Sequence, residues 1–269
     1  MEIKQVTKEM LAIAEMIVDM KKRGFKEQYP IAYEFADNSL EERFKNLEEM
    51  IKKIRKWWKM AQKVLILGNS GTGKSTSIRN LNPDETFVIK CVEKPLPFKK
   101  SEKLYSAEKK NTFTASNIGK VLGALDKINS NAKIKTLIID DFNYLLTFGY
   151  KASAKENGYT KFERLAFGII DIFNKIDSMR NDLIVYVMAH TQKDNDGKIS
   201  MKTIGKFLDE KLVVEGLFSM VFLSLGADSD YRFTVNGVDP AKSPMEMFET
   251  NEVENDLTIT NKAINEYFN

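Results

Sequence analysis

Two patterns of hydrophobic and polar positions follow one another along the chain. In the first sixty residues apolar side chains recur at spacings of three and four, and Ser39 with Glu42 forms a capping box, so two helices are predicted there. From Lys63 onward, short continuous apolar runs alternate with helical patterns. The change predicts an N-terminal helical extension over residues 1–60 and a second domain over residues 61–269.

The second domain has the pattern of a parallel sheet covered by helices. Short continuous apolar runs are typical of strands buried on both faces, and we expect them at Val64–Leu67, Thr86–Val92, Thr136–Ile139, Leu183–Met188 and Met220–Leu225. Helices are expected at Ser75–Leu81, Ala115–Ile128 and Phe162–Arg180, then an edge strand at Tyr231–Val235, irregular structure over 237–255 and a helix at Leu257–Phe268. This alternation predicts an α/β fold with a mostly parallel sheet flanked by helices.

Composition narrows the class of protein. The chain has 269 residues with one cysteine, Cys91, and one histidine, His190, which excludes an internal disulfide and a His/Cys metal cluster. No apolar run reaches the roughly 18 residues that span a bilayer, and the polar N-terminus lacks a signal-peptide stretch. We therefore expect a cytoplasmic protein without a membrane partner. The net charge of +3 does not by itself indicate nucleic-acid binding.

A glycine-rich segment joins the first strand of this domain to its first helix. Residues 68–75 read GNSGTGKS and match the pattern G-x-x-x-x-G-K-[ST] in full. Glycines let successive backbone N–H groups point inward around a phosphate chain, and a helix start adds partial positive charge. We therefore predict a phosphate loop that binds ATP, with Lys74 on the β- and γ-phosphates and Ser75 on Mg²⁺. The predicted nucleotide-binding residues are Gly68, Asn69, Ser70, Gly71, Thr72, Gly73, Lys74, Ser75 and Thr76.

An acidic pair, Asp140 and Asp141, ends the apolar run that begins at Thr136. A carboxylate at this strand tip faces the phosphate loop across the sheet edge where ligands bind in open α/β folds. Asp140 is the predicted Mg²⁺ ligand, directly or through water. Asp141 is either a supporting acid or a turn residue. Asp141 and Glu93 are both candidates for activating water, and the alternative for Glu93 is a surface acid that opens a loop.

With these motifs in place, residues 61–269 resemble the phage-encoded RecA-like ATP-binding proteins of the AAA type, which are linked to single-strand annealing and recombination. The C-terminal stretches AKSP (241–244) and Asn255–Leu257 are also similar to the ends of such proteins. The resemblance implies a P-loop NTPase with a RecA-like sheet. It also implies an oligomer, because such ATPases commonly complete their sites between subunits.

The resemblance assigns further roles to residues of this chain. RecA-like ATPases carry their catalytic glutamate after the strand that follows the phosphate-loop helix, a place that Glu93 fits. They also carry a polar γ-phosphate sensor at a strand end, for which His190, Thr191 and Gln192 are candidates, and a structural histidine is the alternative. The segment Lys193–Lys211 follows this strand, where such proteins place a DNA-binding loop. The alternative is that Lys202 or Lys206 reaches the ATP of a neighbouring subunit.

The resulting hypothesis is a Mg²⁺-dependent ATPase that acts on single-stranded DNA in phage recombination or replication. The resemblance also implies that the protein works in the host cytoplasm and that its partners are phage replication or recombination proteins. The alternatives are a helicase loader or assembly ATPase with the N-terminal helices as a docking arm, and a P-loop small-molecule kinase. A GTPase is not favoured, because the N-K-x-D sequence at 174–177 lies within a helical pattern.

Overall fold

The computed structural model describes residues 60–156, 158, 160–204, 213–227 and 230–268. These residues belong to one compact unit, Met60–Asn269. The helices predicted for the first sixty residues lie outside the described ranges, apart from residue 60, and so do Lys206 and Lys211.

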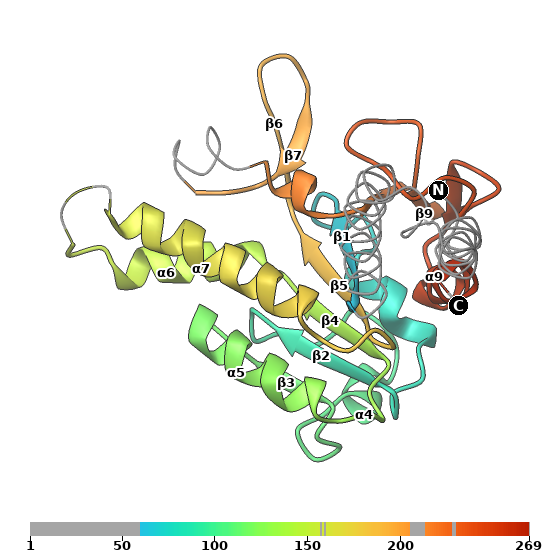
Figure 1. Ribbon diagram of the computed structural model, residues 1–269, viewed down its shortest axis with the longest axis horizontal. Coiled ribbons are helices and arrows are strands. Elements are labelled where there is room, and N and C mark those ends of the chain that lie inside the picture. Colours follow the sequence, from blue (N-terminus) through green and yellow to red (C-terminus); the bar gives the residue numbers. More distant parts are fainter. Residues whose placement is uncertain (1–59, 157, 159, 205–212, 228–229, 269) are drawn as a thin grey trace, which may run out of the picture. The chain divides into compact units, whose positions relative to one another are not determined.

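An eight-stranded sheet forms the centre of this unit, in the order β10-β9-β8-β1-β5-β4-β2-β3 (Figure 1). All neighbours from β8 to β3 are parallel, and β9 and β10 continue the sheet in antiparallel fashion. The strands are β1 (Gln62–Leu67), β2 (Thr86–Lys90), β3 (Thr112–Thr114), β4 (Thr136–Asp140), β5 (Ile184–Ala189), β8 (Met220–Ala227), β9 (Asp230–Thr234) and β10 (Glu252–Glu254).

Helices cover both faces of the sheet. One face packs against α5 (Ile118–Asn129), α6 (Asn143–Ala152) and α7 (Thr160–Asp177), with α5 beside α7. The other face packs against the 3₁₀ helix η1 (Ser75–Asn80) and α9 (Leu257–Phe268). Short helices α4 (Ser101–Leu104) and η2 (Val214–Leu217) and the hairpin of β6 (Thr191–Lys193) and β7 (Ile199–Met201) complete the described elements. No described helix is long and apolar enough to cross a membrane.

The continuous apolar run of β1 divides between two cores. Leu65 and Leu67 belong to the core under α5 and α7, whereas Val64 and Ile66 belong to the core under α9. All four side chains are fully buried, because successive side chains of a strand point to opposite faces and both faces are covered. The glycine-rich segment therefore begins at the carboxyl end of the central strand β1, along the end of the sheet where the parallel strands terminate.

The predicted α/β class with a mostly parallel sheet is confirmed, and the final helix has the predicted bounds. The N-K-x-D sequence lies inside α7, as its helical spacing indicates. The segment 237–255 is not wholly irregular, since it contains β10, and therefore β9 is not the edge strand. The helix after the glycine-rich segment is a 3₁₀ helix of six residues, and β2 ends at Lys90 instead of Val92.

Candidate functional site

The glycine-rich segment runs from the end of β1 to the start of η1, and its backbone requires glycine at three places. Gly71 and Gly73 have φ angles of +84° and +90°, which residues other than glycine rarely adopt. A Cβ on Gly68 would lie 2.5 Å from the hydroxyl of Thr72 and 2.7 Å from the carbonyl oxygen of Ser224. The hydroxyl of Thr72 donates to the carbonyl of Asn69 at 2.9 Å and closes the loop on itself.

Lys74 lies beneath this loop and is buried, with only 6% of its surface exposed. Its Nζ donates to the carbonyl oxygens of Gly68 and Asn69 at 2.7 and 2.8 Å. Burial lowers the pKa of Lys74 to about 8, although the nearby carboxylates of Asp140 and Asp141 oppose the change. A cation is therefore held against two backbone carbonyls of the loop, where an anion inside the loop would meet it.

Ser75 and Asp140 meet across the sheet edge. The Ser75 hydroxyl lies 2.9 Å from both carboxylate oxygens of Asp140. Asp140, at the end of β4, is almost fully buried, and burial together with the charge of Asp141 raises its pKa above the usual value. A hydroxyl and a carboxylate in contact provide the hard oxygen donors that Mg²⁺ prefers, so this donor set fits the predicted metal.

Asp141 lies beside Asp140 and contacts two basic side chains. Its backbone has φ of +59°, and its side chain is nearly buried. One carboxylate oxygen lies 3.4 Å from Nε2 of His190, and the other forms an ion pair with Lys94. Burial alone would raise the pKa of Asp141, but the hydrogen bonds from His190 and Lys94 hold it below its usual value. Asp141 is thus a buried, charged group with both oxygens in contact with basic side chains.

Glu93 has different neighbours. Its side chain is 74% exposed and forms an ion pair with Lys90 at 2.9 Å. A hydrogen bond with Thr114 and a second one from Lys90 lower the pKa of Glu93. The structure thus brings together Lys74, Ser75, Asp140, Asp141 and His190, whereas the contacts of Glu93 are with β2 and β3.

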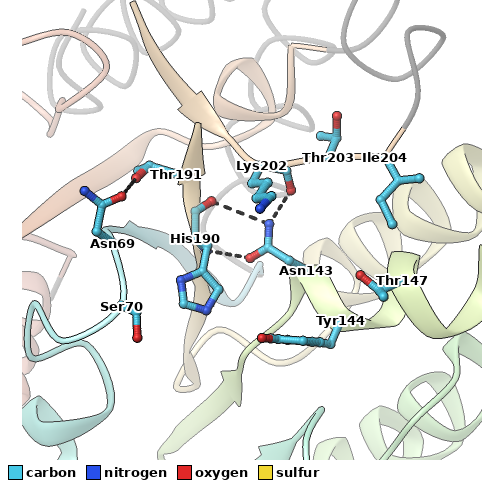
Figure 2. A pocket seen from close by; sticks show the side chains of 10 residues that line it. All are labelled: Asn69, Ser70, Asn143, Tyr144, Thr147, His190, Thr191, Lys202, Thr203 and Ile204. Carbon is cyan, nitrogen blue, oxygen red and sulfur yellow. Dashed lines mark hydrogen bonds between the residues drawn. The ribbon is translucent and has the colours of Figure 1, made fainter. Parts of the chain in front are cut away.

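A pocket of about 370 Å³ lies beside the glycine-rich loop (Figure 2). Asn69 and Ser70 of the loop form one side, and Tyr144 of α6 faces them across the ring of His190. The rings of Tyr144 and His190 are edge to face, with centroids 6.1 Å apart. Lys202 follows the β6–β7 hairpin and completes the lining near His190.

The side chain of Asn143 links the segments that line the pocket through hydrogen bonds. Its Oδ1 accepts the backbone N–H of His190 at 2.5 Å, and its Nδ2 donates to the carbonyl of Lys202. The N–H of Lys202 in turn donates to the carbonyl of His190 at 2.7 Å. Thr191 donates to the side chain of Asn69 at 2.7 Å. The end of β5 is therefore joined to the glycine-rich loop, to α6 and to the hairpin.

Tyr231 lies on the opposite side of the loop. The nearest atom of its ring would be 2.9 Å from a Cβ on Gly73 and 2.3 Å from a Cβ on Gly226. The ring therefore rests on two glycines, while 39% of the residue stays exposed. Sequence reasoning missed Tyr231, Lys94 and Asn143. The only signal for Asn143 was its place two residues after the acidic pair, and none pointed to Tyr231.

Comparisons with known proteins supply no family for this chain. No protein-family model matches it, and no curated protein matches it in sequence. A functional conclusion must therefore come from the contacts of the site itself.

Proposed function

We propose that this protein is a Mg²⁺-dependent P-loop ATPase with a RecA-like core that acts on single-stranded DNA in phage recombination or replication. The observation that carries the proposal is the contact between Ser75 and Asp140 at 2.9 Å, beside the buried Lys74. A phosphate-binding loop needs a cation, a hydroxyl metal ligand and a carboxylate from another strand at one place. These three groups lie together here.

Each of these residues has a role in binding. The N–H groups of the loop and Nζ of Lys74 would bind the phosphates, and Lys74 would exchange carbonyl partners for phosphate oxygens. Ser75 and Asp140 would hold Mg²⁺, which when bound neutralises charge on the β- and γ-phosphate oxygens. Asp140 would ionise fully beside the metal, since a nearby positive charge lowers a carboxyl pKa.

The strand order supports one orientation of the proposed nucleotide. β5 lies between β1 and β4, and His190, which follows β5, contacts Asp141. The terminal phosphate therefore belongs on this side, and His190 is suited to sense it. The nucleoside belongs on the side of β8 and β9, where Tyr231 offers an exposed aromatic ring for a base.

Glu93 remains our proposed general base. Both oxygens of Asp141 contact basic side chains, which leaves that carboxylate poorly suited to accept a proton from water. Glu93 is exposed, and a rotation away from Lys90 and Thr114 would free its carboxylate. We assign Asp141 the task of positioning His190 and Lys94 next to the proposed metal ligand.

DNA is proposed to bind on the side of the β6–β7 hairpin. Lys193 and Lys198 on the hairpin and Lys202 after it are exposed cations, which suit a phosphate backbone. Tyr144 adds an aromatic ring in the pocket next to Lys202. Because Asn143 joins Lys202 to His190, a strand bound here would contact the elements that sense the terminal phosphate.

An assay of phosphate release with and without single-stranded DNA, at low salt, tests this function. We expect Mg²⁺-dependent release of inorganic phosphate that DNA accelerates and that the Lys74→Ala variant lacks. A rate that no DNA changes would contradict the role in DNA metabolism. The pocket beside Ser70 also suits the acceptor of a small-molecule kinase. Transfer of the phosphoryl group to a small molecule, without free phosphate, would favour that second candidate.

A further inference from the structure

The junction between β10 and α9 lies directly behind the glycine-rich loop. Asn255 in this junction is 1% exposed, and its Nδ2 donates to the hydroxyl of Ser224 at 3.2 Å. Ser224 on β8 is fully buried and donates to the carbonyl oxygen of Thr72 at 2.7 Å. A chain of two hydrogen bonds thus leads from the C-terminal part of the protein to the back of the loop.

These two hydrogen bonds fix the orientation of one peptide group. The carbonyl of Thr72 and the N–H of Gly73 belong to the same planar trans peptide, in which the two groups point in opposite directions. Because the carbonyl is fixed toward Ser224, the N–H of Gly73 is directed to the other side. Under the proposed function, that side is where the phosphates bind.

Asn255 is itself anchored to the element that follows the loop. Arg79 of η1 donates to the carbonyl oxygen of Asn255 at 2.5 Å, and Asn80 donates to the carboxylate of Asp256 at 2.5 Å. The same carboxylate accepts the N–H of Thr258 at 2.9 Å and thereby caps α9. The loop and the junction are therefore connected twice, through β8 and through η1.

The side-chain oxygen of Asn255 faces Gly73. A Cβ on Gly73 would lie 3.2 Å from this Oδ1, which accepts no hydrogen bond from the residues that the structure describes. The amide thus packs against the loop as closely as a glycine permits, and it also supports Ser224. A shorter side chain at position 255 would remove both contacts.

We propose that Asn255 is a positioning residue for phosphate binding. Through Ser224 it holds the peptide between Thr72 and Gly73 in the orientation that presents the Gly73 N–H to the phosphates. The proposal rests on the proposed nucleotide binding at this loop. The proposal gives a structural role to the segment Asn255–Leu257, for which the sequence alone suggested no mechanism.

Calorimetry with ATP and with inorganic tripolyphosphate tests the proposal, because tripolyphosphate reports on the loop without a nucleoside. Asn255→Ala should weaken both ligands by the same factor, about three- to tenfold, the effect of one lost hydrogen bond. Ser224→Ala should have a similar effect. The double variant should lose no more than the larger single effect, since the two side chains act in series.

Asn261→Ala is the matched control. Asn261 lies on α9 and also bonds to the sheet, through Thr136 at 2.9 Å and Tyr186 at 2.8 Å, but not to the loop. We expect it to lower the melting temperature and to leave both affinities unchanged. Equal affinities for Asn255→Ala and the unmodified protein, or equal losses in Asn255→Ala and Asn261→Ala, would overturn the proposal.

Amide exchange in the nucleotide-free protein gives a readout that does not depend on ATP. The Gly73 amide should exchange faster in Asn255→Ala than in Asn261→Ala, because its peptide has lost its support. If the unmodified protein bound neither ligand, the proposed function would fail, and this exchange comparison would still decide the positioning. Identical Gly73 exchange in the two variants would refute it.

Discussion

Ser75 and Asp140 are 65 positions apart in the chain, yet the Ser75 hydroxyl lies 2.9 Å from both carboxylate oxygens of Asp140. One residue follows β1 and the other ends β4, and β5 separates these two strands in the sheet. Two hard oxygen donors, one at the start of η1 and one at the end of β4, thus meet at this end of the sheet. This contact is the physical basis for proposing a metal-assisted nucleotide site.

Replacement of Asp140 by asparagine tests the metal site. In the unmodified protein Mg²⁺ should raise the affinity for ATP, and Asp140→Asn should lose most of that gain because a charged ligand becomes a neutral amide. Affinity measured with a chelator present should stay the same in both proteins. Asp182→Asn, which alters an acid paired with Lys135 and Arg180, is the control. Undiminished Mg²⁺ dependence in Asp140→Asn would speak against the assignment.

Replacement of Glu93 by glutamine tests the general base. The amide cannot take a proton, so the turnover number should fall by about 10²–10⁴-fold. The dissociation constant for ATP should not change, since Glu93 contacts Lys90 and Thr114 and not the loop. Glu102→Gln, on the surface helix α4, is the control. Turnover at the parent rate in Glu93→Gln, with none in Asp141→Asn, would transfer the role to Asp141.

Replacement of Tyr231 by alanine tests the nucleoside end of the site. Stacking of a base on an aromatic ring is worth about 1–3 kcal/mol, so Tyr231→Ala should weaken ATP binding by about 5- to 150-fold. Tripolyphosphate affinity should be unaffected, and Tyr231→Phe should bind ATP normally. Tyr267→Ala removes another exposed tyrosine, on α9, as a control. Equal weakening of ATP and tripolyphosphate would mean that Tyr231 supports only the loop.

The sequence predicted the features of this fold that depend on local patterns. The buried strands produce continuous apolar runs because both of their faces are covered, and α9 is marked by its helical spacing. The glycine-rich loop and the acidic strand end also have local signatures. The roles assigned to Lys74, Ser75, Asp140, Glu93 and His190 stay predictions until binding and turnover are measured.

The remaining parts of the site depend on contacts between distant segments. Ser224 and Thr72 are 152 positions apart, and no pattern around either residue indicates that β8 passes behind the loop. The hairpin of β6 and β7 escaped prediction because its strands are only three residues long and β6 is wholly polar. No element was predicted for α6, which begins two residues after the acidic pair.

Calorimetric titration of the folded protein with ATP and Mg²⁺ tests the central claim most directly. We expect a saturable binding heat that requires the loop. Lys74→Ala should weaken binding tens-fold or more, since a charged hydrogen bond is worth about 1.5–3 kcal/mol. Equal affinity in Lys74→Ala and the unmodified protein, or no binding heat in a protein shown to be folded, would contradict the account.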